Sequence, residues 1–145
     1  TAGHRLAGSE ECVVHGDPGP FNTVFREGVP VVFIDWDSAA AGSRMTDLAY
    51  LGWTWCVQAH GDVPVGDQAR RLGLVARAYG GVDADDFLER VAASMRRMAG
   101  IAAEKLVSLD AAHPERPHWR TTLEWASSDT VHFTGHLDLF RKALA

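Results

Sequence analysis

Two short runs of β-favouring residues joined by a turn constrain the fold of this chain more than any other feature. The runs cover residues 23–26 and 31–34, and the Glu-Gly-Val-Pro stretch between them is typical of a turn. Strands joined this tightly pair antiparallel, so their outer ends lie side by side. Asn22 precedes the first strand and Asp35 follows the second, so this hairpin brings a carboxamide and a carboxylate to one edge.

A third polar residue, Asp17, lies on the loop just before the hairpin. Oxygen ligands gathered in this way, with few protein donors in total, suit a Mg²⁺ ion that shares its coordination shell with water and phosphate groups. Asp and Asn are also ordinary turn residues, so each position has a purely structural explanation when it is taken alone. The combination of all three residues in this order favours a site.

The same segment resembles the aminoglycoside phosphotransferase and choline kinase-like family of small-molecule phosphotransferases. Residues 15–22 read His-Gly-Asp, four further residues and Asn, and residues 34–37 read Ile-Asp-Trp-Asp. Protein kinases have His-Arg-Asp with the same spacing from Asp to Asn, and a later Asp-Phe-Gly motif for the metal. The small-molecule kinases have Gly in place of this Arg and Asp-Trp-Asp in place of Asp-Phe-Gly. The run over 40–49 and the final amphipathic helix extend the resemblance over essentially the whole chain.

The resemblance implies a role for each matching residue. Asp17 corresponds to the catalytic Asp, which orients the substrate hydroxyl and accepts its proton. Asn22 and Asp35 correspond to the metal ligands that link Mg²⁺ to the phosphates of ATP. Val24 and Ile34 correspond to apolar residues beneath the adenine ring.

Three further polar residues flank these motifs. His15 corresponds to a structural, hydrogen-bonded histidine behind the catalytic loop, and Asp47 to an Asp at a helix start that braces this loop. Independently of the resemblance, Asp47 suits a helix N-terminus because the helix dipole favours a negative charge there. We interpret Asp37 as a carboxylate that faces solvent or bonds to its own loop rather than as a second metal ligand.

The composition is that of an ordinary globular domain. The 145 residues can bury a core of their own, with 46% hydrophobic and 23% charged residues. The net charge of −5 and the lack of a basic run argue against a nucleic-acid partner, whereas an acidic surface suits a cationic substrate and solubility equally well. The two Cys residues lack zinc-site spacing, and neither a signal peptide nor an apolar run of about 18 residues occurs. We therefore expect a cytoplasmic protein without a membrane partner.

The rest of the chain has the periodicity of helices. We predict helices over residues 46–60, 67–79 and about 83–109, and a last helical stretch over 118–144 with a kink or break at 127–129. Together with the hairpin they make an α+β, mainly helical fold, with a small β-hairpin sheet plus four to five helices. The resemblance implies that this fold is the C-terminal lobe of the protein-kinase-like fold.

We expect a single domain over residues 1–145. Within it, 1–10 form a linker, 11–37 the catalytic loop and metal-binding hairpin, and 46–145 a helical subdomain, with a small, flexible segment at 36–45. Too few residues precede the first motif to form the N-terminal lobe of this family, with its phosphate-covering loop and Lys. We therefore expect the N-terminal lobe to be absent, in either a fragment or a natural truncated form.

The resulting hypothesis is a phosphotransferase that uses Mg²⁺ and moves the γ-phosphate of ATP to a hydroxyl of a small molecule. It would act as an enzyme if it is completed by an N-terminal lobe, since positioning and charge neutralisation are most of what this chemistry asks of the protein. The alternative is a catalytically incompetent, truncated lobe that serves as a binding or regulatory module. A metal-dependent hydrolase is a weaker third hypothesis, because such sites need more metal ligands than this segment offers.

The sequence does not assign the substrate. Trp36, Trp53 and Trp55 lie near the catalytic hairpin in the sequence, where an aromatic box would hold a cationic amine. Trp on a helix face belongs more often to the core, so the structural explanation stays open. The acids at positions 110, 115 and 124 either pair with such an amine or form a solvated face.

An absent N-terminal lobe would leave part of the hairpin uncovered. We expect Val24, Phe25 and Val32 to be exposed in the chain alone. An exposed apolar patch of roughly several hundred Å² invites self-association, so we expect the chain alone to form a homodimer through this face or to aggregate.

Binding of MgATP should stabilise the protein against heat. A ligand present at 100 times its Kd adds about 2.7 kcal/mol to the free energy of unfolding. We expect ATP to raise the melting temperature only in the presence of Mg²⁺, and this shift should be lost in Asp35→Asn. No shift at millimolar nucleotide would contradict a formed nucleotide half-site.

Overall fold

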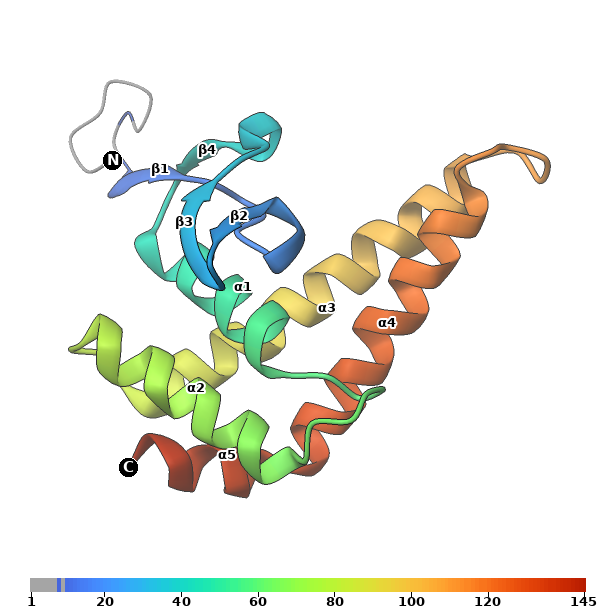
Figure 1. Ribbon diagram of the computed structural model, residues 1–145. Coiled ribbons are helices and arrows are strands. Elements are labelled where there is room, and N and C mark those ends of the chain that lie inside the picture. The colour runs from blue at the N-terminus through green and yellow to red at the C-terminus, as the bar shows by residue number, and fades with distance from the viewer. Residues whose placement is uncertain (1–7, 9) are drawn as a thin grey trace.

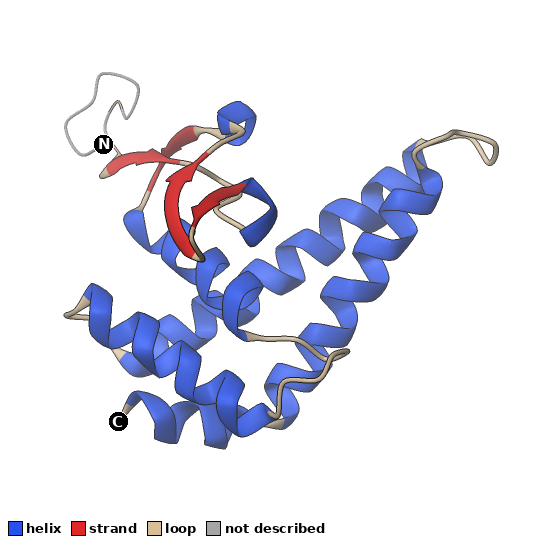
Figure 2. Ribbon diagram, viewed as in Figure 1, coloured by secondary structure: helices blue, strands red, loops and turns tan. Residues whose placement is uncertain are grey.

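The structure, a computed structural model, describes residue 8 and residues 10–145 and is mainly helical (Figures 1 and 2). The strands are β1 (Cys12–Val14), β2 (Thr23–Arg26), β3 (Val29–Phe33) and β4 (Ala40–Gly42). The helices are α1 (Arg44–Cys56), α2 (Val65–Tyr79), α3 (Ala84–Ser108), α4 (Arg116–Gly135) and α5 (Leu137–Leu144). The described residues confirm a mainly helical α+β chain with a small β-hairpin and five α-helices. The linker predicted at 1–10 lies almost wholly outside them.

The predicted hairpin is present, but its turn is shorter than expected. β2 and β3 pair antiparallel, with an irregularity after Val24. β3 begins at Val29 rather than at residue 31, because Glu27 and Gly28 both adopt positive φ angles, 51° and 78°. Two such residues in a row close a two-residue turn that matches the twist of the strands.

The hairpin buries few of its apolar side chains. Val24, Phe25 and Val32 are exposed, as predicted, and so are Val29 and Val31. The exposed apolar surface is therefore confirmed, whereas the homodimer through it stays a prediction.

The segment expected to be small and flexible, residues 36–45, has regular structure instead. Trp36–Ser38 form a 3-10 turn, and β4 pairs antiparallel with β1, so that Ala41 lies opposite Val13. Ala and Gly have low β-propensity and the partner strand lies far earlier in the chain, so the local pattern did not predict this strand.

Helix boundaries agree closely with the predictions for α2 and α3 but differ for α1. This helix begins at Arg44 rather than at residue 46, because the Ser43 hydroxyl accepts a hydrogen bond from the Met45 amide (3.3 Å) and caps the helix. It ends at Cys56, several residues before the predicted end.

The last helical stretch breaks at His136 and not at the predicted 127–129. Asp129 lies inside α4 with its side chain buried, where it accepts hydrogen bonds from the Trp53 indole (2.8 Å) and the Ala59 amide (2.6 Å). A buried carboxylate needs such partners, and here α1 and the loop after it supply them. The Ser-Ser-Asp run therefore stays helical.

α3 lies at the centre of the helical part and packs against α1 and α4. α3 and α4 form a long hairpin whose far end projects beyond the other elements, whereas α2 and α5 pack together at the opposite end (Figure 1). The largest fully buried apolar side chains come from these helices: Trp53, Leu72, Phe87, Leu88, Met95, Val91, Phe133 and Phe140. No helix in the described part of the chain is long and apolar enough to cross a membrane.

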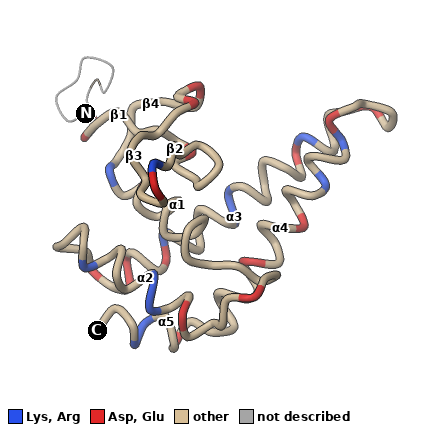
Figure 3. Tube along the Cα trace, viewed as in Figure 1, with Lys and Arg blue, Asp and Glu red and all other residues tan. Residues whose placement is uncertain are grey.

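Charged residues of both signs are interspersed along the helices (Figure 3). The Arg90–Asp86 pair (2.8 Å) and the Arg141–Asp85 pair (2.9 Å) join exposed side chains. Exposed pairs of this kind contribute only about 0–1 kcal/mol each. Burial of the apolar helix faces is therefore the main stabilising term.

Gly73 brings α2 and α5 close together. A β-carbon at this position would overlap the backbone carbonyl oxygen of Ala143 in α5, which cannot move without displacing that helix. We expect Gly73→Ala to lower the free energy of unfolding by about 1–3 kcal/mol through overpacking, measured by chemical denaturation. Gly100→Ala is the control, because a β-carbon there meets nothing within 4 Å in α3 and Ala should stabilise the helix by about 1 kcal/mol. Unchanged stability of Gly73→Ala would contradict this packing.

Candidate functional site

One carboxylate from α1 holds the loop that follows β1. Asp47 lies in the first turn of α1, and its two oxygens accept hydrogen bonds from the backbone amides of His15 (2.7 Å) and Gly16 (2.9 Å). Charge-assisted hydrogen bonds at this range are strong and fix the backbone of both residues. This is the contact that a bracing role for Asp47 requires.

Gly16 turns the loop at a point where no side chain fits. Its φ is +87°, and a β-carbon would lie 2.6 Å from the carbonyl oxygen of Ser38. A residue with a side chain is strained at this φ, and the Ser38 backbone leaves no space for one. The position that protein kinases fill with Arg therefore has to be Gly in this chain.

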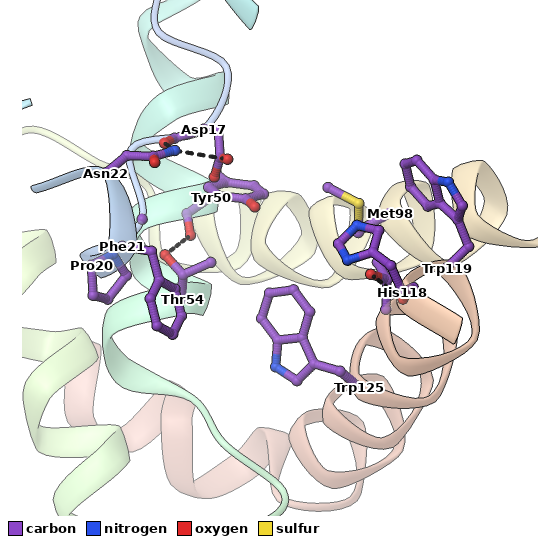
Figure 4. Close-up of a pocket in the computed structure, with 12 residues that line it drawn as sticks. Asp17, Pro20, Phe21, Asn22, Tyr50, Thr54, Met98, His118, Trp119 and Trp125 are labelled. Carbon is purple, nitrogen blue, oxygen red and sulfur yellow. Dashed lines mark hydrogen bonds between the residues drawn. The ribbon is translucent and has the colours of Figure 1, made fainter. Parts of the chain in front are cut away.

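Asp17 and Asn22 are in direct contact at the end of this loop (Figure 4). The side-chain amide of Asn22 donates to Oδ2 of Asp17 (2.9 Å) and to the backbone carbonyl of Asp17 (3.1 Å). Both N–H groups of this amide are thereby used, and its oxygen accepts no hydrogen bond from the described residues. The Asn22 oxygen is therefore available to a ligand.

His15 joins the loop to the end of the hairpin. Its buried ring places Nε2 2.9 Å from the carbonyl oxygen of Ile34, and Trp36 packs on the ring with the centroids 4.5 Å apart. The amide of Ile34 in turn donates to the carbonyl of Asn22 (2.9 Å). Asp35, the next residue, is thus brought to the same edge as Asn22.

Asp35 adopts an uncommon backbone conformation. Its φ and ψ are 61° and 67°, in the left-handed region, where a residue with a side chain is strained. The side chain is exposed and, among the described residues, makes no capping hydrogen bond to the turn that it precedes. Strain of this kind concentrates at ligand-binding positions.

The oxygen atoms at this edge fit Mg²⁺. Asn22 offers a carboxamide oxygen and Asp35 an exposed carboxylate, with Asp17 beside Asn22. The described residues contain no group of three or more His, Cys, Asp and Glu that could hold a metal. Mg²⁺ usually takes one or two protein carboxylates and completes its shell with water and substrate phosphates, so a sparse donor set suits it.

Tyr50 is a site residue that the sequence analysis missed. It follows Asp47 by one turn of α1 and lines a pocket together with Asp17. Burial raises the pKa of Tyr50 well above its ordinary value, and the negative charge of Asp17 raises it further. The phenol therefore stays protonated beside the carboxylate. Its spacing of three residues from Asp47 along a helix is the signal that could have identified it.

The pocket beside Asp17 has a volume of about 590 Å³. Asp17, Asn22 and Phe21 lie on one side of it, and His118 and Trp119 lie on the opposite side (Figure 4). The loop after β1 and α4 thus face each other across a space that could hold a small molecule.

One face of α4 forms the far wall, and the sequence analysis did not predict it. His118, Thr122 and Trp125 line the pocket and recur at spacings of four and three residues, so they share one face of the helix. The spacing is visible in the sequence. Nothing in the sequence, however, indicates that this face meets the catalytic loop.

The Trp residues that lie near the hairpin in the sequence have structural positions instead. Trp53 is fully buried, and Trp125 stacks on it with the ring centroids 4.3 Å apart. Trp55 donates its indole N–H to the carbonyl of Pro18 (2.9 Å) and so supports the catalytic loop from α1. Among the described residues that line the pocket, Trp36, Trp53 and Trp55 do not occur.

The remaining candidates from the sequence also lie outside the pocket. Val24 and Ile34 are 40% and 45% exposed at the hairpin surface, where an adenine ring could contact them. Asp110, Glu115 and Glu124 are exposed, and none of them lines the pocket.

Asp47→Asn should loosen the loop after β1. The new side chain carries an NH₂ group in place of one oxygen, so at least one backbone amide loses its acceptor, at a cost of about 1–3 kcal/mol. We expect faster hydrogen exchange at the His15 and Gly16 amides, measured by NMR. Asp67→Asn is the matched control, because Asp67 also lies in the first turn of a helix and contacts only the exposed Arg70 among the described side chains. Unchanged exchange at both amides would show that the loop does not depend on Asp47.

Comparison with known proteins identifies the family of the chain. Residues 2–79 match the phosphotransferase enzyme family. The trifolitoxin immunity protein of Rhizobium leguminosarum bv. trifolii is 36% identical over 72 residues, which cover 50% of this chain and 26% of that protein. The chain thus spans about a quarter of the length of this curated relative. No solved structure matches the chain. Because the family match covers more than half of the chain and includes every motif residue from His15 to Asp47, the chain belongs to the phosphotransferase enzyme family.

Proposed function

We propose that this chain forms the catalytic and acceptor-binding part of an enzyme that transfers the γ-phosphate of ATP to a hydroxyl of a small molecule. The observation that carries the proposal is the pocket beside Asp17. The Asp17 carboxylate accepts a hydrogen bond from Asn22, and Asp47 accepts one from the backbone of the same loop at His15. Family membership supports phosphotransfer as the reaction class. In this proposal the chain is the C-terminal lobe of a protein-kinase-like fold, with its helical part beneath the site.

Asp17 would act on the acceptor hydroxyl. In the reaction, the hydroxyl oxygen forms a bond to the γ-phosphorus, the bond from this phosphorus to the bridging oxygen of ADP breaks, and the hydroxyl proton passes to Asp17 and then to solvent. The Asn22 amide hydrogen-bonds to one carboxylate oxygen of Asp17 and so orients it. Tyr50, which burial keeps protonated, lines the pocket together with Asp17. Orientation of this kind is the main protein contribution to phosphoryl transfer.

The edge formed by Asn22 and Asp35 would hold Mg²⁺, which when bound neutralises negative charge on the phosphates. The free side-chain oxygen of Asn22 and the exposed carboxylate of Asp35 support this assignment. The exposed side chains of Val24 and Ile34 would contact the adenine ring from the hairpin. The apolar hairpin surface around them suits either the nucleotide or a preceding lobe of the enzyme.

A second candidate is a lobe without catalytic activity that acts as a binding or regulatory module. One observation favours it: the relative from Rhizobium leguminosarum bv. trifolii is named for immunity to trifolitoxin and not for a reaction. Immunity can follow from capture of a molecule as well as from its phosphorylation. The two candidates differ in whether the Asp17 carboxylate is needed.

Asp17→Asn distinguishes them. We expect this change to lower ATP turnover in the full-length protein by about 10²–10⁴-fold, because the acceptor hydroxyl loses its proton acceptor. The assay measures ADP release with Mg²⁺, ATP and a panel of small alcohols and amino sugars. Asp110→Asn is the control, because Asp110 is exposed and does not line the pocket. Turnover that is equal in the Asp17 variant and the wild type would rule out the enzyme proposal.

A further inference from the structure

We infer that the pocket beside Asp17 selects an uncharged acceptor with a flat apolar body, which packs against Trp125 and presents a hydroxyl to Asp17. The inference rests on the proposed function and deepens it by naming the chemical class of the acceptor. It differs from a cationic substrate, which the acidic net charge of the chain would suit no better than it suits solubility. Three properties of the pocket carry it: its charges, its fixed aromatic wall and its exposed aromatic mouth.

The pocket offers a ligand with several ammonium groups few carboxylates to pair with. Among the described residues that line it, Asp17 alone carries a carboxylate, and that group would be occupied by the reacting hydroxyl. A ligand with several ammonium groups would lose water without gaining a partner for each charge, which is costly. An uncharged ligand has no such penalty.

Trp125 is a preformed stacking surface. One side of its ring stacks on Trp53, with an angle of 19° between the planes. Trp53 is itself fixed, because it is fully buried and its indole N–H donates to the buried Asp129. The Trp125 side chain is still 38% exposed and extends into the pocket (Figure 4). A rigid aromatic surface binds a flat apolar group at a small entropic cost.

The other walls are also apolar. Phe21 is 99% exposed at the mouth of the pocket, and Met98 and Trp119 lie across from it (Figure 4). The charged residues near Trp119 do not line the pocket: Glu115 accepts its indole N–H (3.2 Å), and the Lys105 ammonium lies 5.8 Å from its ring centroid. A large aromatic side chain that is almost fully exposed gains burial when an apolar ligand covers it.

Three of the apolar wall residues, Met98, Trp119 and Trp125, lie outside the family match, which ends at residue 79, whereas Phe21 lies inside it. Met98 comes from α3, and Trp119 and Trp125 come from α4. The acceptor class that they determine is therefore a property of this chain's own helices rather than of the shared motif.

Isothermal titration calorimetry of the full-length protein without nucleotide tests the inference. The probe is 2-(2-naphthyl)ethanol, an uncharged aromatic alcohol, and the comparison ligand is neamine, a polycationic amino sugar. We expect the naphthyl alcohol to bind more tightly than neamine. Trp125→Ala should weaken its binding at least about tenfold, whereas Trp125→Phe should keep most of it because a stacking ring remains. Tyr79→Ala is the control, since Tyr79 is an exposed aromatic residue that does not line the pocket.

Each outcome separates this inference from the proposed function. Tighter binding of neamine, or binding of the alcohol that Trp125→Ala leaves unchanged while the variant keeps its melting temperature, would overturn the inference. Turnover that depends on Asp17 but uses only cationic acceptors would support the proposed function and refute the inference. Binding that depends on Trp125, in a protein without ATP turnover, would support the acceptor class and refute the enzyme.

Discussion

The two hydrogen bonds that Asp47 accepts are the constraint on which the site depends. They join the loop after β1 to the start of α1, although the His15 and Asp47 positions are 32 residues apart. The hairpin between them buries few side chains, so burial alone does not hold it in place. Once the loop is fixed, the Asp17 carboxylate meets the Asn22 amide, and the end of the hairpin attaches to the loop through His15. Hydrogen bonds that fix the backbone in this way preorganise a site before any ligand binds.

A second carboxylate has a similar role on the opposite side of the pocket. Asp129 is buried in α4 and accepts hydrogen bonds from Trp53 in α1 and from Ala59 in the loop after it. Because Trp125 stacks on Trp53, the position of the far wall depends on the same contact. Breaking such a buried interaction leaves polar groups without hydrogen-bond partners, so its loss would affect both the fold and the pocket. Asp47 therefore joins the loop on the near side of the pocket to α1, and Asp129 joins the α4 wall on the far side to α1.

The parts of the structure that could be predicted depend on residues close together in the chain. The hairpin follows from local turn chemistry, and it places Asn22 and Asp35 at one edge without further information. α2 and α3 follow from their periodicity and capping residues. β4, the unbroken helix through Asp129 and the position of Trp125 in the pocket depend instead on partners far away in the sequence. A single sequence contains no signal that pairs such positions, so the edge that joins Asn22 and Asp35 was predictable and the α4 wall of the pocket was not.

The left-handed backbone of Asp35 has a consequence for how this position can evolve. A residue with a side chain is strained in this left-handed conformation, whereas Gly adopts it without strain. Selection for stability alone would therefore favour Gly at this position, at the expense of the carboxylate. If the carboxylate binds Mg²⁺ as proposed, stability and activity make opposite demands on one residue, a common trade-off at functional sites. We expect a homologue with Gly at this position to have less backbone strain at the end of the hairpin and to have lost Mg²⁺ binding.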